Sequence, residues 1–222
     1  AIEYSFEFLT SKEWLGIPIN MLAFTVFAGD EDCPFDQEAF DIWRKLGVSE
    51  NRIARLPKKD NWWGPAGQTG PCGPDTEMFY WTGSQPTPEK FDPADKRWVE
   101  IWNDVFMQYN KTAEGKYEPL AQKNVDTGMG VERVTAILQG KKSCYDTELF
   151  QPLFAKLDEV RGLTYDASKE RTREERIVVE HIRAATFIMS DGITPGKVDQ
   201  AYVLRRLIRR AIREARKLGV EG

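Results

Sequence analysis

Residues 97–111, RWVEIWNDVFMQYNK, restrict the possible folds more than any other segment of this sequence. Their alternate positions form two sets, and each set mixes apolar with polar side chains. One set includes Trp98 and Glu100, and the other includes Val99 and Asn103. Neither face is cleanly polar, which is typical of a central strand covered on both sides. The segment therefore predicts a sheet with this strand in its middle.

Strand-like segments are confined to the first two thirds of the chain. The pattern predicts further strands at residues 21–29 and 77–81, a short one at 50–56, and a turn with a short strand at 114–122. Helices are predicted at residues 1–10, 36–47, 128–140, 146–161, 171–192 and 201–219. A loop rich in glycine and proline is predicted at 57–76, and loops of this length are often functional. We expect an α+β domain over residues 1–145, with an antiparallel sheet flanked by helices, and an all-helical region over residues 146–222.

Bulk composition excludes several classes of protein. The 222 residues are 41% hydrophobic and 30% charged, with no run of 18 apolar residues and no signal peptide, so we expect a soluble cytoplasmic protein without a membrane partner. Cys33, Cys72 and Cys144 are widely spaced, which argues against a disulfide framework. With His181 as the one histidine, the chain has little from which to build a zinc site, and we predict no metal site of protein ligands. His181 lies between apolar neighbours and is assigned no catalytic role.

Charge is unevenly distributed along the chain. Residues 1–150 hold 16 Lys/Arg and 24 Asp/Glu, a net of −8, whereas residues 151–222 hold 15 and 11, a net of +4. The predicted helix 201–219 has an apolar stripe, and its other positions carry seven cations and one acid, Glu214. Such charges can simply solvate the outer face of an amphipathic helix. Their single sign in an acidic protein favours a phosphate backbone as the partner.

Residues 124–133, NVDTGMGVER, combine an acid, two glycines and an arginine. A helix N-terminus offers free N–H groups to an anion, and Gly128 and Gly130 would let a ligand approach the backbone. Arg133 can contact phosphate oxygens with its forked guanidinium, and Asp126 can accept from an ammonium group. Alternatively, the segment is a simple strand-to-helix turn with a surface arginine.

The stretch VDTGMGVER resembles the third signature motif of the class II aminoacyl-tRNA synthetases, which binds ATP, and its wording is close to that of the alanyl-tRNA synthetases. Three other stretches resemble the same family in the same order. DNWWGPAGQTGPCGPDTE is similar to its glycine-proline loop, EIWNDVFMQYN to its central active-site strand, and AYVLRRLIRRAIR to the start of its tRNA-recognition helix. The chain is identified as the C-terminal part of such a catalytic domain plus the start of the helical region.

The resemblance implies ATP-dependent activation of alanine and its transfer to the acceptor stem of tRNA(Ala), usually with Mg²⁺. Asp126 would bind the ammonium group of alanine, Asn103 would bind its carboxylate or carbonyl end, and Val105 and Trp63 would line the pocket. Gly128 would leave space for the substrate, while Arg133 and Gly130 would contact ATP. The tRNA contacts implied are Lys197, Asp199, Arg205, Arg206, Arg209, Arg210 and Arg213.

Some of these positions have plainer interpretations. Asn103 can be a satisfied buried amide. Trp62 and Trp63 can equally belong to the core. Two signature motifs of the family have no counterpart in this sequence. These are the family's first two motifs, one of them carrying an arginine for the α-phosphate. They could lie upstream on this chain, on a second chain, or not exist at all, so a missing N-terminal half of the catalytic domain is a candidate partner.

Two substitutions depart from the family pattern. An asparagine that reads a G·U pair in the family falls on Lys197, and lysine cannot reproduce an amide's paired donor and acceptor. Asp75 replaces a common cysteine, with no large consequence expected. The alternatives to an active enzyme are a catalytically inactive module that binds the tRNA acceptor stem and a regulatory paralogue that binds alanine or ATP without transfer.

Overall fold

The computed structural model describes residues 1–220 and divides the chain into two compact units, residues 1–134 and the residues from 135 onward. The boundary predicted after residue 145 stays a prediction. In the structure, Cys144 and Tyr145 pack against the core of the second unit, which accounts for the earlier division.

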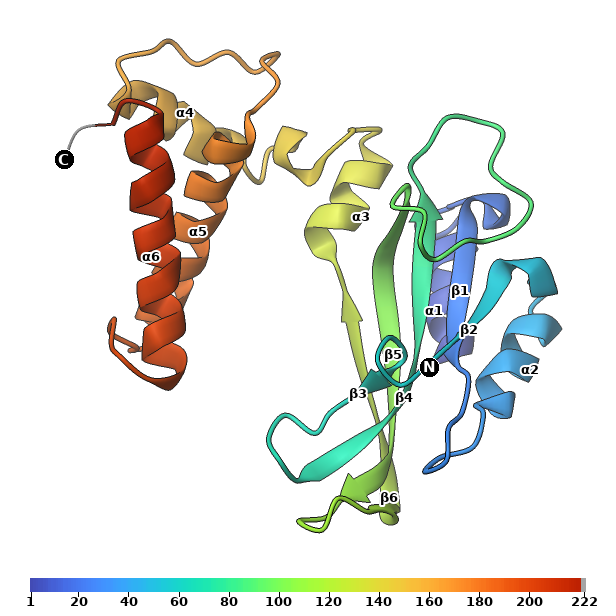
Figure 1. Cartoon of the computed structure of the whole chain (residues 1–222). Coiled ribbons are helices and arrows are strands. Elements are labelled where there is room, and N and C mark those ends of the chain that lie inside the picture. Colours follow the sequence, from blue (N-terminus) through green and yellow to red (C-terminus); the bar gives the residue numbers. More distant parts are fainter. Residues whose placement is uncertain (221–222) are drawn as a thin grey trace. The chain divides into compact units, whose positions relative to one another are not determined.

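The first unit is built around one mixed sheet (Figure 1). Its strands are β1 (Leu22–Phe27), β2 (Ile53–Leu56), β3 (Trp62–Trp63), β4 (Gly70–Trp81), β5 (Trp98–Lys111) and β6 (Tyr117–Met129). The order is β2-β1-β4-β5-β6, and β3 pairs with β4. Only β1 and β2 are parallel among the described pairs, so the predicted α+β architecture with an antiparallel sheet is confirmed apart from that one edge.

Two strands are much longer than predicted. Residues 70–76 belong to β4 rather than to a loop, and β6 extends over 13 residues instead of forming a short strand. Both pair with β5, and this pairing overrides the weak strand propensity of glycine and proline. Gly73 allows the close approach, because a Cβ there would collide with the carbonyl oxygen of Phe106.

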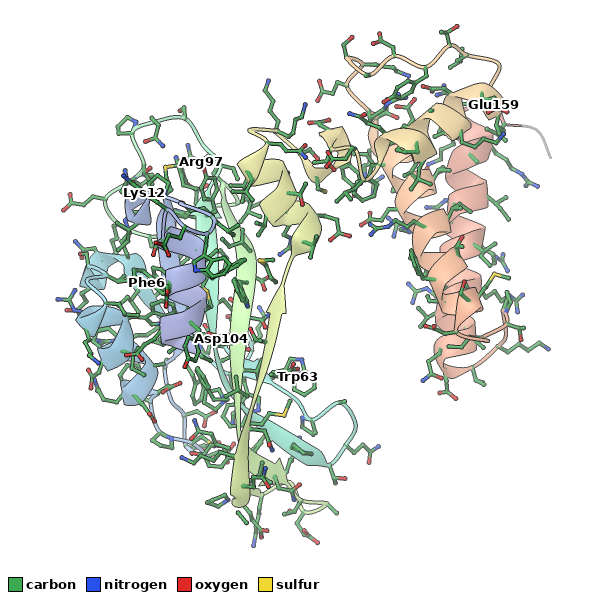
Figure 2. All side chains as sticks on the ribbon, turned by 180° about the vertical axis from the view of Figure 1, so that it is seen from behind. Phe6, Lys12, Trp63, Arg97, Asp104 and Glu159 are labelled. Carbon is green, nitrogen blue, oxygen red and sulfur yellow. The ribbon has the colours of Figure 1, made fainter. Side chains whose placement is uncertain are left out.

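Two helices, α1 (Ile2–Thr10) and α2 (Gln37–Lys45), cover one face of this sheet. The Ser5 hydroxyl on α1 donates to Asp104 Oδ2 at 2.9 Å, and Trp43 Nε1 on α2 donates to Thr76 Oγ1 at 2.8 Å. Figure 2 labels Asp104, seen from the side that carries these helices. Side chains alternate across a strand, so the residues next to Asp104 and Thr76 point to the opposite face. We call that opposite face the open face.

The chain passes to the second unit through α3 (Val131–Leu138), and the second unit contains α4 (Gln151–Val160), α5 (Arg173–Ser190) and α6 (Asp199–Lys217). Figure 1 shows α5 and α6 side by side. The core consists of Phe150, Phe154, Leu157, Val178 and Val179. The predicted helices at 171–192 and 201–219 are confirmed, whereas α4 begins later than predicted.

A buried charge network fixes the start of α5. Thr172 and Glu175 form a capping box, and the carboxylate of Glu175 also accepts from Arg161 Nη1 at 2.6 Å and from Lys169 Nζ at 2.8 Å. These partners hold the pKa of Glu175 down at about 2, against the opposing effect of its burial.

None of the helices found in residues 1–220 has the length and the apolar character that a membrane crossing requires.

Candidate functional site

The register of β4, β5 and β6 gathers most of the predicted site residues on the open face. Val105 pairs with Asp75 on β4 and with Asp126 on β6. Residues directly opposite each other in a ladder point to the same face, so two carboxylates flank Val105. Val105 is buried, with 2% of its surface exposed, whereas Asp126 is exposed.

A second row of residues lies next to the first on the same face. Asn103 pairs with Glu77 on β4 and with Gly128 on β6. A Cβ added to Gly128 would meet only Asn103 Oδ1, at 3.7 Å, which is an ordinary contact. Asn103 is half-buried and donates from Nδ2 to Glu100 Oε1 at 3.3 Å, so it keeps part of its amide available.

A β-bulge brings Glu100 to this row. Met78 pairs with Trp102 and Phe79 pairs with Glu100, which leaves Ile101 as an extra residue on β5. Strict alternation would place Glu100 on the side of Trp102, but its contact with Asn103 puts it on the open face.

Arg133 on α3 approaches the same carboxylate. Its Nη1 donates to the carbonyl oxygen of Glu100 at 2.8 Å and to Glu100 Oε2 at 3.1 Å. Gly130 makes this possible, because a Cβ there would lie 3.2 Å from Arg133 Cδ. About half of the Arg133 side chain remains exposed.

The position of Gly128 corrects the sequence analysis. It lies within β6, not at a helix N-terminus, because β6 continues to Met129 and α3 begins at Val131. Gly130 occupies the turn itself: its N–H donates to the Ile101 carbonyl at 2.8 Å, and its carbonyl accepts from Val134 N at 2.9 Å. Of the two glycines, Gly130 alone is at the start of the helix.

The open face carries strongly perturbed carboxyl groups that the sequence analysis missed. Burial, together with the nearby charges of Glu100, Asp75 and Asp60, raises the pKa of Glu77 to about 8. Burial also raises the pKa of Asp75 to about 7, while a hydrogen bond from Asn61 opposes the shift. Such values cluster at functional sites. The sequence analysis expected no large consequence from Asp75, although its carboxyl group is one of these perturbed groups.

The two adjacent tryptophans of β3 differ in environment. Trp62 packs against Phe27, Tyr109 and Tyr117, with ring centroids 5.3, 5.7 and 5.3 Å away. Trp63 pairs with Gly73, keeps 40% of its surface exposed and is labelled in Figure 2. Trp62 therefore packs among aromatic rings, whereas Trp63 keeps an exposed surface.

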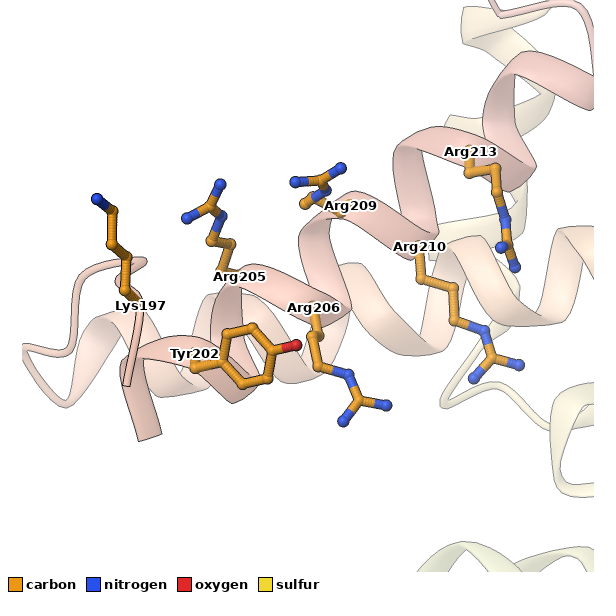
Figure 3. A pocket seen from close by; sticks show the side chains of 7 residues that line it. All are labelled: Lys197, Tyr202, Arg205, Arg206, Arg209, Arg210 and Arg213. Atoms are coloured by element: carbon orange, nitrogen blue, oxygen red, sulfur yellow. The ribbon is translucent and has the colours of Figure 1, made fainter. Parts of the chain in front are cut away.

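A separate group of cations lies on the second unit (Figure 3). It lines a groove of about 710 Å³. The lining residues are Lys197, Tyr202, Arg205, Arg206, Arg209, Arg210 and Arg213. Figure 3 shows the arginine side chains extending from successive turns of α6. We call this surface the arginine groove.

Glu214 on α6 forms ion pairs with cations of its own helix. Glu214 is buried, and its carboxylate accepts from Arg213 Nη2 at 2.8 Å and from Lys217 Nζ at 2.6 Å. The expectation that Glu214 shares the cationic face is therefore wrong. Asp199 is exposed and begins α6 with a φ of 49°, close to Lys197 in sequence. No group of three His, Cys, Asp or Glu residues within 1–220 could hold a metal ion.

A family model described as tRNA synthetases class II (A) matches residues 1–222. The chain belongs to the class II tRNA synthetase family. The match covers residues 1–222 and does not identify them as the C-terminal part of a catalytic domain, as the sequence analysis had stated.

Curated relatives give the same result. An alanine–tRNA ligase of Treponema denticola is 52% identical over 226 residues, covering 100% of this chain and 38% of the relative. One of Treponema pallidum is also 52% identical, covering 100% of this chain and 37% of the relative, and one of Borrelia hermsii is 47% identical, covering 100% and 38%. This similarity supports membership of the alanine–tRNA ligase family. The chain spans less than two fifths of the length of these relatives.

Proposed function

We propose that this chain carries the amino-acid site and part of the ATP site of an enzyme that joins alanine to tRNA(Ala). In the first step, the carboxylate of alanine attacks the α-phosphate of ATP, and pyrophosphate leaves. In the second step, the alanyl group moves to the terminal adenosine of the tRNA. Catalysis then depends on orientation and charge stabilisation and needs no protein nucleophile.

The observation that carries this proposal is the shared face of β4, β5 and β6. In the proposed complex, Asp126 accepts from the ammonium group of alanine, and Asn103 donates to its carboxylate end. Val105 and Trp63 contact the methyl group. Gly128 leaves the space beside the Asn103 amide, where its missing Cβ would otherwise lie 3.7 Å from Oδ1. These four contacts suit a small amino acid.

The ATP contacts are proposed at the start of α3. Nη1 of Arg133 is engaged with Glu100, so its other guanidinium nitrogens can bind the γ-phosphate. Gly130 supports this by leaving room for the Arg133 side chain. Mg²⁺ is usually bound by one or two carboxylates together with substrate phosphates, and we assign it no ligand among the described residues. When bound, it would neutralise charge on the triphosphate.

The arginine groove is the proposed contact for the tRNA acceptor stem. Lys197, Arg205, Arg206, Arg209, Arg210 and Arg213 line it, and we propose that they bind backbone phosphates. Asp199 and Lys197 are the proposed contacts nearest to the base pairs. An enzyme with this function would work in the cytoplasm.

Alanine-dependent exchange between ATP and pyrophosphate tests the proposal. The assay uses this chain alone and the same chain supplied with an N-terminal half of the catalytic domain. We expect exchange that depends on alanine in at least the supplied form, with weak discrimination against glycine, because one methyl group contributes only ~1–3 kcal/mol. No exchange together with salt-dependent RNA binding would favour an RNA-binding module. Thermal stabilisation by alanine without exchange would favour a regulatory paralogue.

A further inference from the structure

Asp75 mirrors Asp126 across the central strand. Both pair with Val105, one from each side, so their side chains leave the same face of the sheet. Neighbouring strands are ~4.8 Å apart, which places the two Cα atoms about 10 Å apart. A small cationic group above Val105 would therefore lie within reach of both carboxylates.

Asn61 fixes the position of the Asp75 carboxylate. Asn61 is fully buried, and its Nδ2 donates to Asp75 Oδ1 at 2.8 Å, to the Asp75 carbonyl at 3.1 Å and to Thr25 Oγ1 at 2.7 Å. Asp75 N donates back to the Asn61 carbonyl at 3.3 Å. The carboxylate is thus held from one side through Oδ1.

Two acceptor atoms remain available at this position. Within residues 1–220, Asn61 Oδ1 is buried and has no hydrogen-bond partner. Asp75 is 7% exposed, and its Oδ2 accepts no hydrogen bond from the described residues. Asn61 Oδ1 is enclosed, but Asp75 keeps 7% of its surface exposed, so Asp75 Oδ2 is suited to a donor from a ligand.

The surroundings of Asp75 lack a balancing cation. The charged groups that face it are Glu77 on its own strand, Glu100 on β5 and Asp126 on β6, with Asp60 beside Asn61. Arg133, the cation of this region, is bonded to Glu100. A cationic donor from a ligand would therefore stabilise the ionised form of Asp75, whose pKa is raised to about 7 in its absence.

We propose that Asp75 is a second acceptor for the ammonium group of the amino-acid substrate, opposite Asp126, and that Asn61 is its positioning residue. The inference rests on the proposed function and adds to it a clamp of two carboxylates for one cation. It predicts that ligand binding draws a proton away from Asp75 near neutral pH.

Isothermal titration with L-alanine tests this on the full chain, in two pH 7 buffers of different ionisation enthalpy. The wild type should release about half a proton per alanine bound, because Asp75 with a pKa of about 7 is half protonated at pH 7. Asp75→Asn should bind alanine at least about 10-fold more weakly with no such release. L-Lactate, which has a hydroxyl group in place of the ammonium, should bind the two proteins equally. Asp60→Asn is the matched control, since it removes an exposed charge beside Asn61 and should leave alanine binding unchanged.

Several results would overturn the inference. Asp75→Asn that binds alanine like the wild type, while Asp126→Ala does not, would remove Asp75 from the site and leave the proposed function intact. Equal weakening of alanine and lactate would give Asp75 a structural role only. A wild type that binds no alanine would overturn both proposals together.

Discussion

The arginine groove makes the salt dependence of RNA binding predictable. Each phosphate contact contributes about 0.7–0.9 to the slope of log K against log salt. Arg206, Arg209 and Arg210 are exposed groove residues with no acidic partner in the described residues, whereas Arg213 is paired with Glu214. Replacing these three arginines with glutamine should lower the slope by about 2–3. Their contribution corresponds to a roughly 20- to 40-fold loss of affinity between 50 and 200 mM salt.

The assay is fluorescence anisotropy with a labelled RNA hairpin that carries the acceptor stem, at four salt concentrations. Arg209→Gln alone should lower the slope by about 0.7–0.9. Arg216→Gln is the matched control, because Arg216 is exposed on the same helix but does not line the groove. Equal effects of Arg209→Gln and Arg216→Gln, or weaker binding with an unchanged slope, would refute the assignment.

Three further substitutions test other parts of the structure. Glu175→Gln should cost about 3–5 kcal/mol, because it removes the buried charge that Arg161 contacts at 2.6 Å and leaves the more distant Asp158 at 3.8 Å. Thermal melts should show this loss at pH 7, and it should disappear as the pH falls from 4.5 towards 2, because the pKa of Glu175 is lowered. Burial raises the pKa of Glu77 to about 8, so the folded state favours the protonated carboxyl group, and the wild type loses stability as the pH rises from about 4.5 through 8. Glu77→Gln does not titrate, so its melting temperature should rise relative to that of the wild type over this range, by ~2–4 °C per kcal/mol. Gly128→Ala should leave the melting temperature nearly unchanged but weaken alanine binding about 10-fold, because the new methyl group lies beside the Asn103 amide.

Strong patterns in the sequence predicted β5, α5 and α6, whereas β4 and β6 are much longer than predicted. The helix α5 is followed by Gly192, and the central strand and the last helix carry their own signals, the two mixed faces of β5 and the apolar stripe of α6. The glycine-proline stretch of β4 does not, because its strand conformation depends on pairing with β5. Local propensity therefore did not predict the strand conformation of residues 70–76, which depends on pairing with a segment distant in sequence.

The candidate site was only partly predictable for the same reason. Asp126, Asn103 and Val105 were proposed from motifs, and the ladder register brings them to one face. Glu100 could not be placed from alternation, because the bulge at Ile101 reverses its direction. Glu214 was misplaced because its burial depends on tertiary packing that helical periodicity does not reveal.

The most direct test of the account is the affinity for alanine after Asp126→Ala, measured by titration calorimetry. A hydrogen bond between charged groups contributes about 1.5–3 kcal/mol, so we predict a loss of about 10- to 150-fold. Glu118→Ala removes an exposed acid from the same strand and should change nothing. Unchanged affinity in Asp126→Ala would contradict the account.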